Sequence, residues 1–265
     1  MRNQITSFSN DRVKSIIRLR DKRSRDIEKK FVIEGYRENL KAIYSKKISF
    51  DSLYICPECF LGKNEESLIE KFNVKIFELP RKVFEKISYR DRPDGILSVA
   101  TIPDFQFPCN EKLDGEIFLI IEGVEKPGNL GTILRTAEGG GVNAVIVANP
   151  KIDLFNPNVI RSSTGTLFTI PTYISEIESV INFFRSQQIQ ILAISPDGNI
   201  PYYENIYDKK TALVFGSEQY GLSQYAKENS DRKIFIPMKG EADSLNLAMS
   251  CGIVLYEVLR QRATS

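Results

Sequence analysis

The apolar residues of this chain fall into short continuous runs that alternate with stretches of helical periodicity. Up to residue 101, the pattern predicts helices over residues 10–20, 36–46, 68–72 and 83–87, and strands over residues 31–33, 53–56, 74–77 and 96–100. Strands that alternate with helices are typical of an α/β domain. The charged stretch RLRDKRSRDIEKK, residues 18–30, lacks this pattern and is interpreted as an exposed turn or helix end.

The rest of the chain repeats the alternation with longer apolar runs. The pattern predicts strands over residues 117–121, 142–147, 170–173, 189–194, 212–215 and 234–236. Near-continuous apolar runs are typical of central parallel strands, which are buried on both faces. Helices are predicted from Asn129 to the glycines at 139–141, and over residues 157–163, 177–187 and 244–260. The last helix carries one apolar stripe, made of Leu245, Ala248, Met249, Gly252, Ile253 and Tyr256.

A proline-containing stretch without periodicity separates these two halves. Residues 102–115 are therefore interpreted as a linker. The sequence predicts a small α/β domain over residues 1–101 and a second α/β domain, with a mostly parallel sheet, over residues 116–265.

The charge of the chain is concentrated at one end. Residues 1–47 hold 14 Lys and Arg against 6 Asp and Glu, a net charge of +8, so the remaining residues carry −6 of the overall +2. A basic end on a near-neutral chain indicates a polyanionic partner, and the plainer explanation is a solvated helix face. The chain shows no apolar run of membrane-spanning length and no signal-peptide pattern, so we expect a cytoplasmic protein without a membrane partner.

The residue types present exclude several kinds of chemistry. The chain has no histidine, which removes Ser-His-Asp triads and histidine-ligated metals. Cys56 and Cys59 form a lone CxxC pair with no second pair, so two structural thiols are favoured over a zinc or redox site. We therefore predict no metal site.

Polar and glycine-rich loops follow several of the predicted strands. They cover residues 123–131, 216–221 and 237–244, with a fourth at 195–198. Ligands bind at the carboxyl ends of strands in open α/β sheets. Ser244 stands where its hydroxyl is expected to cap the last helix. The chain has neither GxxxxGK[ST] nor GxGxxG, which disfavours phosphate-loop and dinucleotide sites.

Three stretches carry a resemblance to a known family. They are NLGTILRTA at 129–137, LVFGSEQYGLS at 213–223, and IPMKG at 236–240 followed by SLNLA at 244–248. They resemble, in order, the three signature motifs of the SpoU/TrmH family, which are S-adenosylmethionine-dependent RNA 2′-O-ribose methyltransferases of the SPOUT class. The resemblance covers about residues 116–262. The first domain is similar to the ribosomal-protein-like substrate-binding domain of many such enzymes, through residues 31–35 and 94–97.

The resemblance implies a fold and a cofactor site that periodicity does not indicate. The second domain is expected to hold a deep trefoil knot that binds S-adenosylmethionine, and to form a homodimer. Matching motif positions place these residues around the cofactor: Ile194, Ser195, Gly216, Ile236, Met238, Ser244 and Leu245.

The resemblance also implies a set of catalytic residues: Arg135, Asn129, Glu218, Ser244 and Asn246. Arg135 is either the proton acceptor of family proposals or, because a guanidinium stays protonated, an anchor for a substrate phosphate. Asn129 and Asn246 are expected to orient the ribose or Arg135, and Glu218 to pair with Arg135. The plainer alternatives are a helix cap for Asn129 or Ser244, a structural ion pair for Glu218, and a core position for Met238.

Taken together, these features predict a methyltransferase that acts on a ribose 2′-hydroxyl, with large-subunit (23S) rRNA favoured over tRNA. The phosphate contacts are assigned to basic residues of the first domain: Arg12, Lys14, Arg18, Arg20, Lys22, Arg23 and Arg25. The alternatives are a tRNA 2′-O-methyltransferase and a non-catalytic RNA-binding or ribosome-assembly protein of the same fold.

Overall fold

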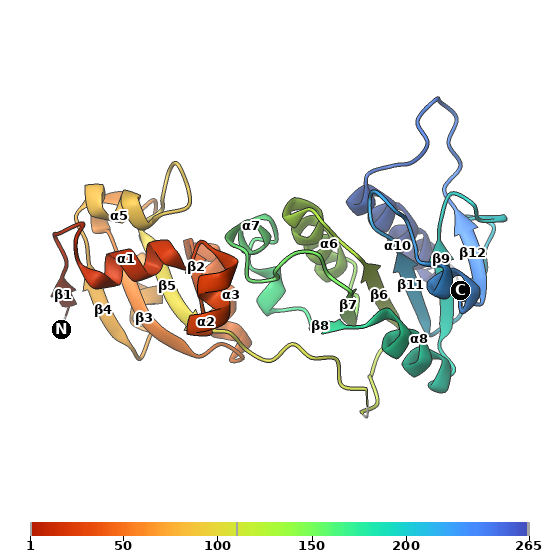
Figure 1. Cartoon of the computed structure of the whole chain (residues 1–265), viewed down its shortest axis with the longest axis horizontal. Coiled ribbons are helices and arrows are strands. Elements are labelled where there is room, and N and C mark those ends of the chain that lie inside the picture. The colour runs from red at the N-terminus through yellow and green to blue at the C-terminus, as the bar shows by residue number, and fades with distance from the viewer. Residues whose placement is uncertain (1, 110, 264–265) are drawn as a thin grey trace. The chain divides into compact units, whose positions relative to one another are not determined.

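The chain forms two compact units in its computed structural model, which describes residues 2–109 and 111–263 (Figure 1). The first unit contains the residues up to Asp104 together with Asp153–Thr169. The second contains Phe105–Ile152 and the residues from Ile170 onward.

The first unit is built on a five-stranded mixed sheet in the order β1-β4-β3-β5-β2. Its strands are β1 (Arg2–Gln4), β2 (Lys30–Glu34), β3 (Phe50–Ile55), β4 (Lys75–Glu78) and β5 (Ile96–Thr101). Its helices are α1 (Asp11–Arg18), α2 (Lys22–Glu28), α3 (Tyr36–Ser45), α4 (Glu65–Ile69), α5 (Arg81–Ile87) and α7 (Pro157–Ser162), with 3-10 turns at Pro57–Cys59 and Thr166–Phe168. The predicted α/β character is confirmed.

The charged stretch at residues 18–30 differs from its prediction, because most of it forms helix α2. The carboxylate of Asp21 caps this helix by accepting a hydrogen bond from the backbone N–H of Ser24 at 3.1 Å. Arg25, inside the helix, is 2% exposed. Periodicity missed the helix because its buried side chain is charged, and such residues are almost never inside unless paired.

The segment Asp153–Thr169 packs in the first unit, although the sequence placed it in the second domain. The ring of Phe155 lies 4.6 Å from that of Phe31 in β2, and the ring of Phe168 lies 6.1 Å from it. Asp153 Oδ2 also accepts hydrogen bonds from Arg25. The aromatic side chains of this segment thus pack against a strand that lies more than 100 residues earlier in the chain.

The second unit contains a seven-stranded sheet in the order β10-β12-β9-β11-β6-β7-β8, and each of these strands runs parallel to its neighbours. The strands are β6 (Ile117–Glu122), β7 (Ala144–Ala148), β8 (Thr172–Ser175), β9 (Gln190–Ile194), β10 (Ile200–Pro201), β11 (Thr211–Phe215) and β12 (Arg232–Phe235). The helices are α6 (Pro127–Gly139), α8 (Ile177–Ser186), α9 (Gln224–Glu228) and α10 (Leu247–Ala263). The predicted mostly parallel sheet is confirmed, and the trefoil knot stays a prediction.

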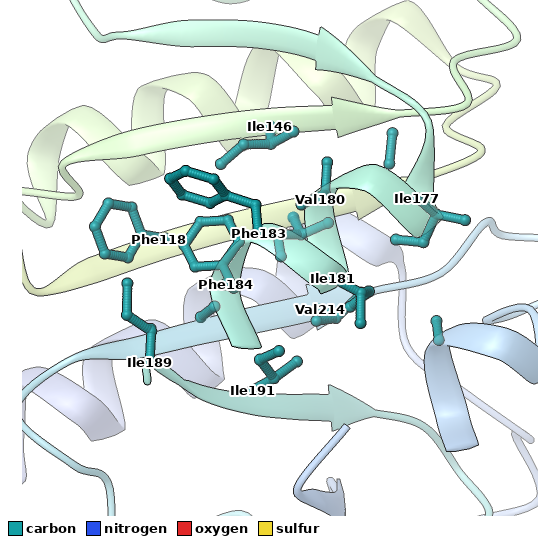
Figure 2. Packing of buried hydrophobic residues seen from close by; sticks show 14 of the residues in the cluster. Phe118, Ile146, Ile177, Val180, Ile181, Phe183, Phe184, Ile189, Ile191 and Val214 are labelled. Carbon is teal, nitrogen blue, oxygen red and sulfur yellow. The ribbon is translucent and has the colours of Figure 1, made fainter. Parts of the chain in front are cut away.

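A continuous apolar core lies between this sheet and helix α8 (Figure 2). Phe184 of α8 lies 5.1 Å, ring to ring, from Phe118 of β6. Part of the predicted linker joins this core, because Phe107 is 7% exposed and its N–H donates to the backbone oxygen of Ile174 in β8 at 3.0 Å. Burial of such large apolar surfaces is the main stabilising term of the unit.

Helix α10 starts later than predicted and buries a different face. It begins at Leu247, and the side chain of Asn246, instead of Ser244, accepts the N–H of Ala248 at 3.0 Å. The buried face is made of Leu247, Ala248, Cys251, Val254, Leu255, Glu257 and Val258. Of the predicted stripe, Met249 and Tyr256 are 61% and 55% exposed. The helix has apolar residues on two faces, and spacing alone cannot tell which face meets the core.

Candidate active site

The candidate site lies at the edge of the second sheet where its parallel strands end. The loops that follow β6, β9, β11 and β12 meet there, as the sequence predicts for a parallel sheet. They surround a cavity of about 520 Å³. Its wall is completed by the residues that lead into α10, so the second and third motif stretches both line this space.

Each of the seven predicted cofactor positions lines this cavity: Ile194, Ser195, Gly216, Ile236, Met238, Ser244 and Leu245. Met238 is 37% exposed, so it is a wall residue and not a core residue. Ser244 contributes to the wall but caps no helix, because α10 begins three residues later. The assignment of these positions to a cofactor stays a prediction.

The loop after β11 folds back tightly on itself. The N–H of Ser217 donates to the oxygen of Gly221 at 3.0 Å, and the N–H of Gly221 donates back at 3.1 Å. A Cβ at position 216 would lie 2.1 Å from the backbone carbon of Gly221, so only glycine fits there. The loop therefore brings backbone, without side-chain cover, to the wall of the cavity.

Three polar motif residues form one hydrogen-bonded chain beside the cavity. The amide nitrogen of Asn246 donates to Asn129 Oδ1 at 3.1 Å, and the amide nitrogen of Asn129 donates to Glu218 Oε1. Glu218 Oε2 is buried and has no hydrogen-bond partner among the described residues. Because an unsatisfied buried carboxylate oxygen is costly, this atom is suited to accept a hydrogen bond from a ligand.

The predicted pairing of Glu218 with Arg135 is wrong. Arg135 lies on α6 with an exposed side chain, and within residues 2–109 and 111–263 its guanidinium has no ion pair. Glu218 bonds to Asn129 instead. Asn129 is also not a helix cap, because α6 begins two residues earlier at Pro127. The structure thus joins Asn129, Glu218 and Asn246 and leaves Arg135 free to meet an anion.

The loop after β9 contributes a second carboxylate near the cavity. The hydroxyl of Ser195 donates to Asp197 Oδ1, and the ammonium of Lys227 lies 3.0 Å from Asp197 Oδ2. These hydrogen bonds, that of Ser195 first, hold the pKa of Asp197 below its ordinary value. Asp197 thereby stays ionised and fixes the Ser195 hydroxyl.

Several residues that line the cavity were not predicted. They include Lys126, Phe215, Leu222, Leu247 and Ser250. Phe215, Leu222 and Leu247 lie within the motif stretches and Lys126 within the predicted loop 123–131, so their position in these stretches was the available signal. Ser250 had no such signal, because its approach to the cavity depends on where α10 begins.

The predicted RNA-contacting residues of the first unit are exposed except for one. Arg12, Lys14, Arg18, Arg20, Lys22 and Arg23 reach the surface of α1, α2 and the turn between them. The assignment of Arg25 to phosphate binding is wrong, because its guanidinium is buried between Asp153 and the backbone oxygens of Leu19 and Arg20. A buried and fully paired cation has no donor to offer an outside phosphate.

The two CxxC thiols are free and buried. Burial, and then the hydrogen bond with Cys59, raise the pKa of Cys56 to about 12, so it is protonated at neutral pH. The described residues hold no group of three or more metal-ligating side chains. No helix in the described part of the chain is both long and apolar enough to cross a bilayer.

Comparisons with known proteins agree with this geometry. The model of the SpoU rRNA Methylase family matches residues 116–256, and that of the MRM3-like substrate binding domain matches residues 10–98. The 23S rRNA (guanosine(2553)-2′-O)-methyltransferase RlmP of Bacillus subtilis (strain 168) is 28% identical over 255 residues, which cover 96% of this chain and 98% of that protein.

Solved structures resemble the whole chain. A crystal structure of an RNA 2′-O ribose methyltransferase is 33% identical, with a TM-score of 0.83 over 98% of this chain and 99% of that one. The AdoMet-bound rRNA methyltransferase from Sinorhizobium meliloti is 29% identical, with a TM-score of 0.88 over 98% of each chain.

Proposed function

The chain belongs to the SpoU rRNA Methylase family, and we propose from this membership that it transfers a methyl group from S-adenosylmethionine to a ribose 2′-hydroxyl of 23S rRNA. The predicted family and enzyme class are confirmed. Large-subunit rRNA stays favoured over tRNA, because RlmP, similar over nearly its whole length, is named for 23S rRNA. The observation that supports the site assignment is that the second and third motif stretches line one cavity, while Asn129 of the first is hydrogen-bonded to Glu218 and Asn246 in its wall.

The cavity suits S-adenosylmethionine in size and in chemistry. Its volume of about 520 Å³ falls in the usual range for small-molecule sites. Ile194, Ile236 and Leu222 offer apolar walls for an adenine ring, while the bare backbone at Gly216 allows close approach. When bound there, S-adenosylmethionine supplies an electrophilic methyl group.

The polar chain is suited to hold the ribose. Glu218 Oε2, buried without a partner among the described residues, is placed to accept a hydrogen bond from a hydroxyl. Asn129 donates to the other carboxylate oxygen of Glu218, and Asn246 donates to Asn129, so the three side chains hold one another in place. Holding the hydroxyl in line with the methyl group is the main task of the residues, since positioning alone lowers such a barrier strongly. The Glu218 carboxylate is also the group proposed to accept the hydroxyl proton.

Arg135 is assigned to an RNA phosphate and not to proton removal. Its guanidinium is exposed and unpaired within the described residues, and guanidinium groups in general are poor proton acceptors. An unpaired guanidinium forms strong bidentate hydrogen bonds with phosphate oxygens. One such bond would fix the backbone of the target nucleotide beside Glu218.

The first unit is assigned to docking of structured RNA. It contains the match to the MRM3-like substrate binding domain and the exposed basic residues of α1 and α2. The residues proposed to contact phosphate are Arg12, Lys14, Arg18, Arg20, Lys22 and Arg23. Binding that rests on such contacts weakens steeply as salt rises.

A homodimer in the cytoplasm completes the proposal. The outer face of α10 carries Met249 and Tyr256, which are 61% and 55% exposed, beside the half-buried Ile253. Apolar side chains in a stripe on a solvent-facing helix favour association with a second copy. The cytoplasm is where 23S rRNA is modified and assembled.

The test is transfer of a labelled methyl group from S-adenosylmethionine to protein-free 23S rRNA and, separately, to bulk tRNA. Mass spectrometry of nuclease digests then identifies the methylated nucleotide and its ribose. We expect a single 2′-O-methylated nucleotide in 23S rRNA. If label appeared only in tRNA, tRNA would replace 23S rRNA as the proposed substrate. If calorimetry showed no binding of the cofactor at millimolar concentration, a non-catalytic RNA-binding protein would be favoured.

A further inference from the structure

One aromatic side chain beside the candidate site has no structural role that its contacts explain. Tyr220 is 69% exposed, although it lies in the tight loop between Gly216 and Gly221. Its backbone N–H donates to the hydroxyl of Ser217 at 3.0 Å, which fixes the turn from which the ring projects. Exposed aromatic rings are the groups on which unstacked bases stack in proteins that bind RNA.

Charged residues from two neighbouring loops support this ring. The ammonium of Lys151 lies 4.5 Å from the ring centroid, within the range of a cation–π contact. Lys151 is also held by Glu125, whose carboxylate is 3.0 Å from the ammonium. These three residues follow β11, β7 and β6, which are adjacent strands in the sheet. The ring is therefore supported across the sheet edge at which the cavity opens.

The position of the ring relates it to the reacting ribose. Tyr220 follows Glu218 by two residues in the same loop, and Glu218 bears the buried oxygen without a described partner. Lys126 and Lys151, both basic, flank the same edge. An exposed aromatic ring among cations fits a nucleobase attached to a phosphate backbone better than it fits an apolar peptide.

We propose that Tyr220 is the platform on which the base of the target nucleotide, or its immediate neighbour, stacks while the ribose lies against Glu218. This inference rests on the proposed function. Lys151 covers one face of the ring, and the opposite face receives the base. Where the target nucleotide is unstacked from its neighbours, an aromatic ring replaces the lost stacking. Because every base has a π-face, this platform contributes affinity for an unstacked nucleotide more than sequence choice.

The test compares Tyr220→Ala, Tyr220→Leu and Tyr220→Phe in steady-state methyl transfer to 23S rRNA, with calorimetry of S-adenosylmethionine binding. Loss of one stacked base predicts an about tenfold lower kcat/KM for the Ala and Leu variants, expressed mainly in KM for RNA. Tyr220→Phe keeps the ring and is expected to retain wild-type kinetics. Cofactor affinity is expected to stay unchanged in all three variants.

A matched control is available in the first unit. Tyr44 on α3 is 63% exposed and also carries a lysine ammonium, that of Lys71, 5.7 Å from its ring. Tyr44→Ala is expected to leave kcat/KM unchanged. Equal activity of the Leu and Phe variants at position 220, or weaker cofactor binding by Tyr220→Ala, would overturn the stacking role. Absence of transfer by the wild-type protein would instead refute the proposed function, and the inference with it.

Discussion

Glu34 in the first unit and Glu218 in the second both stand where a strand gives way to a loop, yet their surroundings differ. Both oxygens of Glu34 are bonded: Oε2 accepts the N–H of Tyr89 at 2.7 Å, and Oε1 accepts the hydroxyl of Ser88. Glu218 has one oxygen bonded to Asn129 and one with no partner among the described residues. Glu34 is buried, and so is the Oε2 atom of Glu218, so the difference lies in how many acceptors the protein itself satisfies.

This comparison separates a structural carboxylate from a functional one. A carboxylate whose acceptors are all filled by its own chain holds a loop in place, and removing its charge costs stability. A buried carboxylate oxygen that has no partner in the protein and lies beside a cavity can accept a hydrogen bond from a ligand. The same distinction applies to Arg25, which is buried and paired, and Arg135, which is exposed and unpaired within the described residues.

The largest expected effect is that of Arg135→Ala. Loss of the phosphate anchor should lower methyl transfer to 23S rRNA by about 10³-fold, comparable to loss of a strong electrostatic contact to the transition state. The thermal midpoint should not change, because the side chain makes no ion pair within the described chain. Full activity of this variant would remove Arg135 from the site.

Arg25→Met should show the opposite behaviour. It leaves Asp153 and two backbone oxygens without their donor, so the free energy of unfolding should fall by about 3 kcal/mol. The matched variant Arg23→Met alters an exposed neighbour and should change stability by less than about 0.5 kcal/mol. Urea denaturation of both variants measures this difference, and equal stability would show that the buried pair is not structural.

The third prediction concerns substitution of each glutamate by glutamine, which replaces one carboxylate oxygen with an NH₂ group. Glu218→Gln should reduce kcat/KM by about 10²-fold, because the amide is a poorer acceptor for the ribose hydroxyl. Glu34→Gln should lose about 1–3 kcal/mol of stability, because its new NH₂ group faces one of the two donors, Ser88 or Tyr89, while the activity of the folded protein persists. Kinetics and urea denaturation of both variants test the comparison, which fails if the two losses are alike.

The smallest expected effect concerns pH. Because Ser195 and Lys227 lower the pKa of Asp197 in the folded chain, its contribution to stability is present above its unfolded pKa of about 3.9 and is lost as pH falls through the folded value. Asp197→Asn should therefore lower the thermal midpoint slightly at pH 7, and the gap to wild type should close below about pH 4. A gap that is constant with pH would exclude this linkage.

Many of the helices and strands were predicted correctly from the local pattern of apolar and polar residues. Apolar runs such as residues 189–194 and 212–215 became the central strands β9 and β11, because continuous apolar sequence is stable only where both faces are covered. The glycine at motif position 216 also has a local structural reason, since glycine is the one residue type that fits there against Gly221. Local pattern missed β1, β10 and α9, and it also missed α2 and the true start of α10, which depend on partners distant in the chain.

The sequence by itself determined the α/β elements, the family, and the positions around the cavity, because each rests on residue types at fixed spacing. Tertiary structure alone decided how those groups pair. In the fold, Arg25 is buried against Asp153, 128 residues away, and Glu218 accepts a hydrogen bond from Asn129 instead of pairing with Arg135. Pairing depends on which side chains the fold brings within hydrogen-bond distance, and neither composition nor periodicity carries that information.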